Sequence, residues 1–92
     1  MSNLQQLSYL EKYEILLQTD ISTAEIRLLN KCGIGKAIEI RVNCEKIILN
    51  EGFMLLAHKR VNTWAYMKLY GLTYDQFERI PEVNNWLKEN RK

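Results

Sequence analysis

Few residues of this chain carry side chains that could do chemistry, and their spacing gives them no partners. Cys32 and Cys44 stand twelve positions apart, and the one histidine, His58, lies further along the chain. This is the spacing of neither a disulfide framework nor a zinc site built from Cys and His. No pair of carboxylates and no nucleophile with a base can be assembled from the sequence. We therefore expect two reduced thiols, no metal, no cofactor and no enzymatic activity.

Two glycines one residue apart, Gly33 and Gly35, could instead bind a phosphate through backbone amides. A nucleotide-binding loop follows a buried strand and has Ser or Thr directly after its Lys, but here a helix pattern precedes the glycines and Ala37 follows Lys36. A helix-hairpin-helix also turns on Gly-apolar-Gly and binds a DNA phosphate, yet it needs a small residue where Glu39 stands. That interpretation stays open, whereas a plain turn between two helices needs no exception.

Apolar residues at helical spacing predict three helices around these glycines, over roughly 4–18, Ser22 to about Lys31, and Lys36 to about Glu51,. A capping box begins the second helix. We expect Gly33 to supply the left-handed residue at its exit and Gly52 to stop the third helix.

The later part of the chain predicts a small hairpin followed by short helices. Residues 53–61, "FMLLAHKRV", have an apolar start, a polar middle and a renewed apolar residue, which is typical of a β-hairpin with its tip near Ala57 to Lys59,. One helix is predicted to start at Asn62 or Thr63 and to end at Gly71. A capping box of Thr73 and Gln76 begins a second helix, which reaches Arg79,. Pro81 stands in the first turn of a third,.

These elements fit one compact, mainly α domain, a winged helix-turn-helix with a small two-stranded β wing. In this interpretation the domain covers 1–92, with the helix-turn-helix at about 22–51, the wing at about 53–61 and the C-terminal helices at about 63–91. We expect Leu28 and Leu29 to face the core, Ile34 to fill the gap between the two helices and Val42 to anchor the second.

Charge is distributed unevenly, although the net charge is only +2. Residues 1–26 carry one basic side chain against four acidic ones, residues 27–68 carry eight against three, and residues 69–92 balance. A basic block of this kind raises a nucleic-acid hypothesis without deciding it.

On a helical wheel the third helix presents one polar stripe of Lys36, Glu39, Asn43, Lys46 and Asn50,. Such a stripe could enter a major groove, or it could be an ordinary solvated face. The basic hairpin tip favours the groove, because a wing beside a recognition helix contacts flanking phosphates. The candidate DNA contacts are therefore Arg27, Lys36, Glu39, Asn43, Lys46, His58, Lys59 and Arg60.

Two further features of the helices concern packing. The third helix has one apolar side of Ala37, Cys44, Ile47 and Ile48 and a second of Ile38, Val42 and Leu49, with a predicted ion pair of Arg41 and Glu45 between them,. The leucine-rich first helix has more apolar surface than one intramolecular contact covers, which predicts a homodimer.

The run from Cys32 to Gly71 resembles a group of small excisionase-like winged helix-turn-helix proteins from phages and integrative elements of low-GC Gram-positive bacteria. The resemblance rests on "CGIGKAIEIRVNCEKIILNEGF", "HKRV" and "WAYMKLYG", and it covers under half of the chain. It implies DNA binding for regulation or recombination, without catalytic activity. The acidic first helix and the segment after Gly71 depart from the pattern and are candidates for oligomerisation or a partner site.

We therefore expect a cytoplasmic protein that binds double-stranded DNA in a sequence-specific way and has no membrane partner. The rival hypothesis is a protein-binding module, such as a phage-encoded inhibitor of a host protein, which would use the aromatic and acidic surface.

Overall fold

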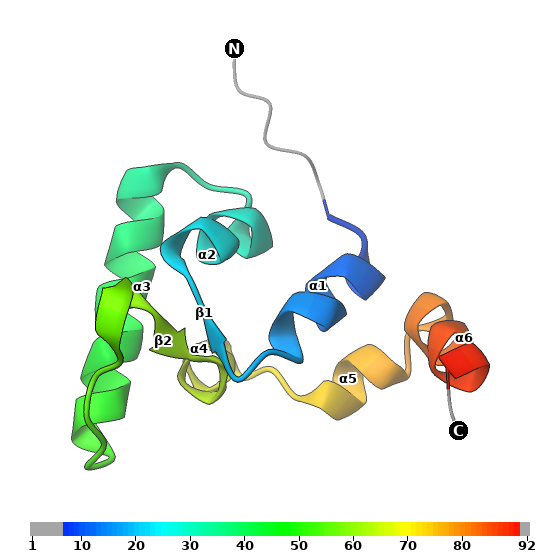
Figure 1. Ribbon diagram of the computed structural model, residues 1–92. Coiled ribbons are helices and arrows are strands. Elements are labelled where there is room, and N and C mark those ends of the chain that lie inside the picture. Colours follow the sequence, from blue (N-terminus) through cyan, green and yellow to red (C-terminus); the bar gives the residue numbers. More distant parts are fainter. Residues whose placement is uncertain (1–6, 91–92) are drawn as a thin grey trace.

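The computed structural model describes residues 7–90, which form six α-helices, one short 3-10 turn and two short strands (Figure 1). The helices are α1 (Tyr9–Leu16), α2 (Thr23–Asn30), α3 (Ile34–Asn50), α4 (Thr63–Tyr70), α5 (Tyr74–Glu78) and α6 (Pro81–Asn90). The strands are β1 (Asp20–Ile21) and β2 (Val61–Asn62), and the 3-10 turn is η1 (Ala57–Lys59). The prediction of a compact, mainly α fold with a small two-stranded sheet is confirmed at this level.

Helix starts follow local capping chemistry. Ser22 Oγ accepts a hydrogen bond from Glu25 N at 3.1 Å, and Ser22 N donates to the Glu25 carboxylate at 2.8 Å. The same reciprocal pair joins Thr73 with Gln76 at the start of α5, so both predicted capping boxes are confirmed. A third box, of Ser8 and Glu11, begins α1. Since Ser8 is extended, the helix starts at Tyr9, later than the predicted start near residue 4. Residues 4–6 of the predicted helix lie outside the described part of the chain.

The turn between α2 and α3 differs from the prediction in one residue. Lys31, with φ 48° and ψ 56°, is the left-handed residue at the exit of α2, and Cys32 N donates to Arg27 O at 3.2 Å. Gly33 is extended and stands directly before α3, which therefore starts at Ile34 and includes Gly35. The prediction that Gly33 makes the left-handed turn was wrong. Gly52, with φ 89°, follows the end of α3 as expected,.

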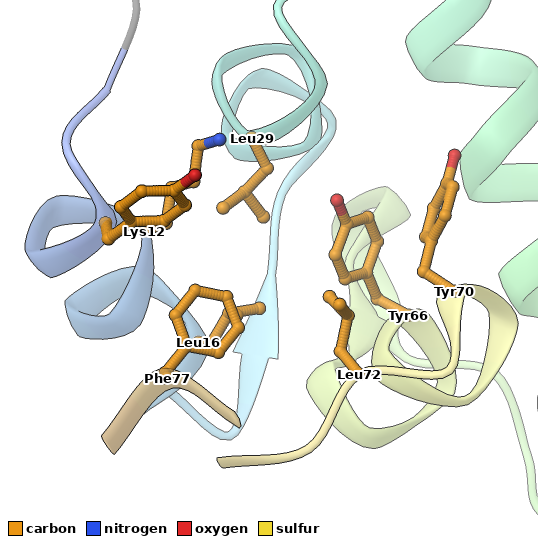
Figure 2. Close-up of a pocket in the computed structure, with 8 residues that line it drawn as sticks. Lys12, Leu16, Leu29, Tyr66, Tyr70, Leu72 and Phe77 are labelled. Carbon is orange, nitrogen blue, oxygen red and sulfur yellow. The ribbon is translucent and has the colours of Figure 1, made fainter. Parts of the chain in front are cut away.

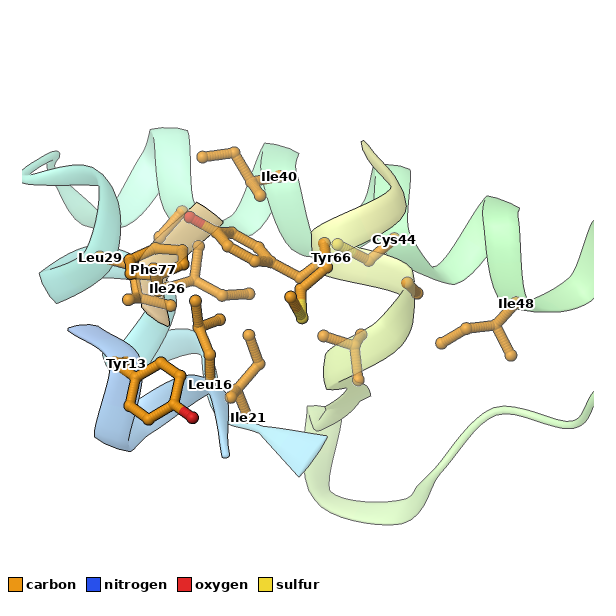
Figure 3. Close-up of a cluster of buried hydrophobic side chains, with 14 of the residues drawn as sticks. Tyr13, Leu16, Ile21, Ile26, Leu29, Ile40, Cys44, Ile48, Tyr66 and Phe77 are labelled. Atoms are coloured by element: carbon orange, nitrogen blue, oxygen red, sulfur yellow. The ribbon is translucent and has the colours of Figure 1, made fainter. Parts of the chain in front are cut away.

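The core lies between α3 on one side and α1, α2 and α4 on the other (Figure 3). Four residues of α3 are buried, namely Ala37, Ile40, Cys44 and Ile48. They meet Ile26 and Leu29 of α2 and Tyr66 of α4 in one hydrophobic cluster. Of the four predicted packing residues, only Leu29 is buried, while Leu28 and Ile34 are exposed and Val42 is half-buried.

Helix α1 packs against α5 and α6 at the opposite side of the molecule from α3 (Figure 1). Tyr13 and Leu16 are its buried residues, and the Tyr13 hydroxyl donates to Glu78 of α5 at 2.9 Å. The segment after Gly71 therefore covers the apolar side of the first helix. Among residues 7–90, no helix has the length and apolarity that a membrane span requires.

The sheet joins segments forty residues apart instead of forming a local hairpin. Strand β2 pairs antiparallel with β1, with Asp20 opposite Asn62 and Ile21 opposite Val61. The predicted hairpin over 53–61 was therefore wrong, because residues 53–56 form no strand and residues 57–59 form a 3-10 turn. Pairing with β1 buries Ile21 and Val61 completely, an apolar burial that a hairpin at the surface would not provide.

Candidate nucleic-acid interface

Helix α3 is the element that positions most of the predicted DNA contacts. Its buried side packs on α2 and α4, so the opposite side faces outward along the edge of the molecule (Figure 1). On that outward side Lys36, Glu39, Lys46 and Asn50 are exposed, and Asn43 is half-buried at its border. The predicted polar stripe is thus a surface of the protein.

The first turn of α3 carries unpaired backbone donors and no acid. No side chain caps Gly33, and the first turn of α3 contains no Asp or Glu. A Cβ built on Gly33 or Gly35 would meet no atom within 4 Å, so the backbone is open to an approaching group. Lys31 and Lys36 stand exposed on either side of this turn. Unpaired amides and the positive end of the helix dipole together favour an anion such as phosphate.

The charged side chains of the polar stripe make only weak interactions within the protein. Lys36 Nζ lies 3.6 Å from Glu39 Oε2, but both side chains are about 60% exposed (59% and 64%), so water screens this pair,. Among residues 7–90, Lys46 takes part in no ion pair and the Asn43 amide makes no side-chain hydrogen bond. Both groups are therefore available to an external partner.

Arg41 has a structural role within the protein. Its Nε lies 3.4 Å from Glu45 Oε2, and its Nη1 donates to Thr23 Oγ1 at 3.3 Å. The predicted ion pair of Arg41 and Glu45 is confirmed. Because the Arg41 guanidinium also reaches the start of α2, it fixes the angle between α2 and α3 and does not extend toward solvent.

Arg27 and Arg60 were both predicted to contact the DNA backbone, and the structure gives both internal partners. Arg27 Nε donates to Cys32 O at 3.2 Å, which closes the turn before α3. Arg60 forms an ion pair with Asp20, donates to Asp20 O at 3.1 Å, and lies 3.6 Å from the Glu25 carboxylate. These contacts tie β2 to β1 and to the start of α2.

The ion pair of Arg60 with Asp20 also shifts the titration of both groups. Hydrogen bonding from Arg60 lowers the pKa of Asp20 below its ordinary value of 3.8, against a smaller opposing effect of desolvation. The same hydrogen bond raises the pKa of Arg60. The pair is only about two-thirds shielded from solvent, so its contribution is partly screened.

The remaining two predicted contacts, His58 and Lys59, lie in η1. Both are exposed, with positive φ angles of 61° and 58°. The structure thus groups Lys36, Glu39, Asn43 and Lys46 on one helix, leaves His58 and Lys59 on a separate loop, and engages Arg27 and Arg60 internally. Lys31, at the exit of α2, lies near the first group, and the sequence could have indicated it by its place two residues before Gly33.

A cleft of about 310 Å³ opens between α1 and α4, with Leu29 of α2 and residues of the α4–α5 region also lining it (Figure 2). Its walls are largely apolar, with Lys12 at one side and the Tyr66 and Tyr70 hydroxyls at the other. Asn30 holds both tyrosines, accepting from Tyr66 Oη at 2.7 Å and donating to Tyr70 Oη at 3.1 Å. Burial raises the pKa of Tyr66, so this hydroxyl stays protonated and acts as a hydrogen-bond donor.

Within residues 7–90, no group of three His, Cys, Asp or Glu side chains is placed to hold a metal ion. Burial raises the pKa of the Cys44 thiol to about 12, which keeps this cysteine unreactive. Comparison with family models, with curated proteins and with solved structures finds no match to this chain.

Proposed function

We propose that the protein binds double-stranded DNA with α3 in the major groove, in a sequence-specific way. The observation that carries this proposal is the outward face of α3, where an uncapped, acid-free first turn is followed by polar side chains without strong internal partners. Phosphate contacts and base contacts require these two kinds of groups respectively. The proposal does not depend on a wing.

Roles follow from the position of each group along α3. The amides at Ile34 and Gly35, with Lys31 and Lys36, bind a phosphate and fix the register of the helix. Further along, the Asn43 amide can make paired hydrogen bonds to adenine, and Lys46 can donate to guanine. His58 and Lys59 add charge near the backbone, whereas Arg60 has no part in the interface.

The test separates sequence-specific contacts with the bases from non-specific electrostatic attraction to DNA. A preferred site is first selected from a random duplex library, and Asn43→Ala is then titrated against that site and against a scrambled duplex. We expect a loss of about 1–3 kcal/mol on the selected site and little change on the scrambled one. The matched control is Asn85→Ala on the exposed surface of α6, which should leave both affinities unchanged.

Two results would contradict the proposal in different ways. Equal losses on both duplexes would remove α3 from the reading role while leaving DNA binding intact. An absence of measurable anisotropy change at about 50 mM salt with the whole library would remove DNA binding itself, since non-specific attraction is strongest at low salt. The protein-binding module would then be the remaining hypothesis.

A further inference from the structure

Six large apolar side chains are exposed in the last turn of α3, in the loop that follows it and at the start of α4. This apolar cluster consists of Leu49, Phe53, Met54, Leu55, Leu56 and Trp64. Met54 is 86% exposed and Phe53 is 60% exposed. The Phe53 and Trp64 rings meet edge to face, 5.6 Å apart, so the loop is joined to the start of α4.

The local fold holds these residues at the surface. Gly52 takes a left-handed conformation, and Phe53 N donates to Ile48 O at 3.1 Å, which ends α3 and turns the chain back. The segment after Phe53 then leads back from the end of α3 toward β2 (Figure 1). As a result, four consecutive apolar residues are exposed to solvent. They stay outside the core because Ile48 and Val61 already fill it.

The exposed area of the cluster exceeds what a monomer usually shows. Its six residues are between 37% and 86% exposed, which corresponds to on the order of 700 Å² with backbone atoms included, whereas the largest apolar patch of a typical monomer measures about 300–600 Å² and is often functional. Two such patches packed against each other would bury at most on the order of 1,400 Å², which reaches the lower part of the range of about 1,200–2,000 Å² for a specific interface.

We propose that the apolar cluster is the surface on which a second copy of this chain docks, with the same residues meeting across a two-fold axis. An interface of this kind needs a patch that is complementary to itself. The cluster contains no charge, and its acidic neighbour Glu51 is paired with Lys68, so self-contact brings no like charges together at its centre.

This surface replaces the one expected for a homodimer from the leucine-rich first helix. The buried Tyr13 and Leu16 of α1 are covered by α5 and α6 within one chain. What α1 still exposes, chiefly Tyr9 and Leu17, is smaller than the apolar cluster. Since the cluster lies at the opposite end of α3 from Gly33, docking there leaves the first turn of α3 free. The dimer does not depend on DNA binding, and its test uses the protein alone.

Light scattering of the full chain between about 5 and 200 μM tests the proposal. We expect the mass to rise from monomer to dimer with concentration, and Met54→Asp to keep the protein monomeric by placing a charge in the interface. Met54 is 86% exposed, so at about 5 μM, where both chains are monomeric, circular dichroism and Tm should be the same for the variant and the natural chain. The matched control is Ile34→Asp, an apolar position that is also exposed (54%) but lies at the other end of α3, and this variant should remain dimeric.

A crosslinking experiment locates the two-fold axis. In a Cys32→Ser background, Met54→Cys should form a disulfide-linked dimer under mild oxidation, and Ile34→Cys should not. A chain that stays monomeric at 200 μM, or a dimer that Met54→Asp and Phe53→Asp leave intact, overturns the proposal.

Discussion

At the scale of single residues, Arg60 shows how a side chain suited to DNA is used inside the protein. Its guanidinium joins β2 to Asp20 of β1 and approaches Glu25, which also belongs to the capping box of α2. One charged group therefore links the start of β2 to β1 and α2, and its partner Asp20 lies forty positions earlier in the sequence. Removing it would disturb the fold, and a loss of DNA affinity in an Arg60 variant would not identify a phosphate contact.

The pair of Asp20 and Arg60 makes stability depend on pH in a defined direction. Because the folded-state pKa of Asp20 is lowered below 3.8, the pair contributes fully above that ordinary value and is lost as pH falls through the folded-state pKa. We expect Asp20→Asn to have a lower Tm than the natural chain at pH 7 and the difference to shrink toward pH 2.

Thermal unfolding followed by circular dichroism across this pH range checks the prediction. The matched control is Asp75→Asn in the exposed pair with Arg79 on α5, where both side chains are at least two-thirds solvent-accessible (67% and 80%). An exposed pair of this kind contributes little. A constant difference in Tm between Asp20→Asn and the natural chain at all pH values would contradict the assigned cause.

Residue roles could be predicted where the partner lies within one helical turn. The capping boxes of Ser22 and Thr73 and the pair of Arg41 and Glu45 all have this spacing, so the sequence alone indicates them. Arg60 and Asp20 are forty positions apart, and nothing in a linear pattern couples them. The sequence therefore could not show that Arg60 has an internal partner in Asp20.

At the scale of elements, the turn before α3 contains a non-glycine residue whose backbone conformation is energetically unfavourable. Lys31 takes the left-handed conformation, which costs a residue with a side chain about 1–2 kcal/mol relative to glycine. We expect Lys31→Gly to stabilise the fold by about 0.5–1 kcal/mol in chemical denaturation, since glycine's larger unfolded-state freedom offsets part of the gain. Affinity for duplex DNA should fall in the same variant, because a proposed phosphate contact is lost.

The control for this prediction is the other helix exit with the same conformation. Gly71 ends α4 with φ 66°, so Gly71→Ala should destabilise the fold by about 1 kcal/mol or more and leave DNA affinity unchanged. If Lys31→Gly destabilised the fold, the side chain of Lys31 would have a packing role that its exposure does not suggest.

Element boundaries were predictable from local rules, but strand pairing was not. The ends of α3 and α4 lie beside Gly52 and Gly71 as expected, and Pro81 is the first residue of α6. The run "FMLLAHKRV" has the apolar ends and polar middle from which a hairpin was predicted, yet only its last residue enters a strand. Ile21 was assigned to no strand, because two residues of strand give too short a pattern to recognise.

At the scale of the whole molecule, the net charge of +2 is small, so the proposed DNA binding would rest on a few well-placed contacts. Each phosphate contact contributes a slope of about −0.9 to log K against log salt. We expect Lys36→Ala to reduce this slope by roughly one unit on any duplex. Lys88→Ala, which removes an exposed charge from α6 at the other side of the molecule, should leave the slope unchanged; equal effects of the two variants would indicate general attraction alone.

The small sheet gives the molecule a further property. Strands β1 and β2 are neighbours in space, so the chain leaves this sheet at Ile21, builds α2 and α3, and returns to it at Val61. In an antiparallel pair the facing Cα atoms lie only about 5 Å apart. The proposed reading unit is therefore an insertion whose two ends meet, carried on a base of α1, α4, α5 and α6. A unit bounded in this way can be exchanged between related chains at two adjacent junctions, provided that the residues facing α4 are kept. New DNA specificity could thus arise by recombination of one segment, without redesign of the base.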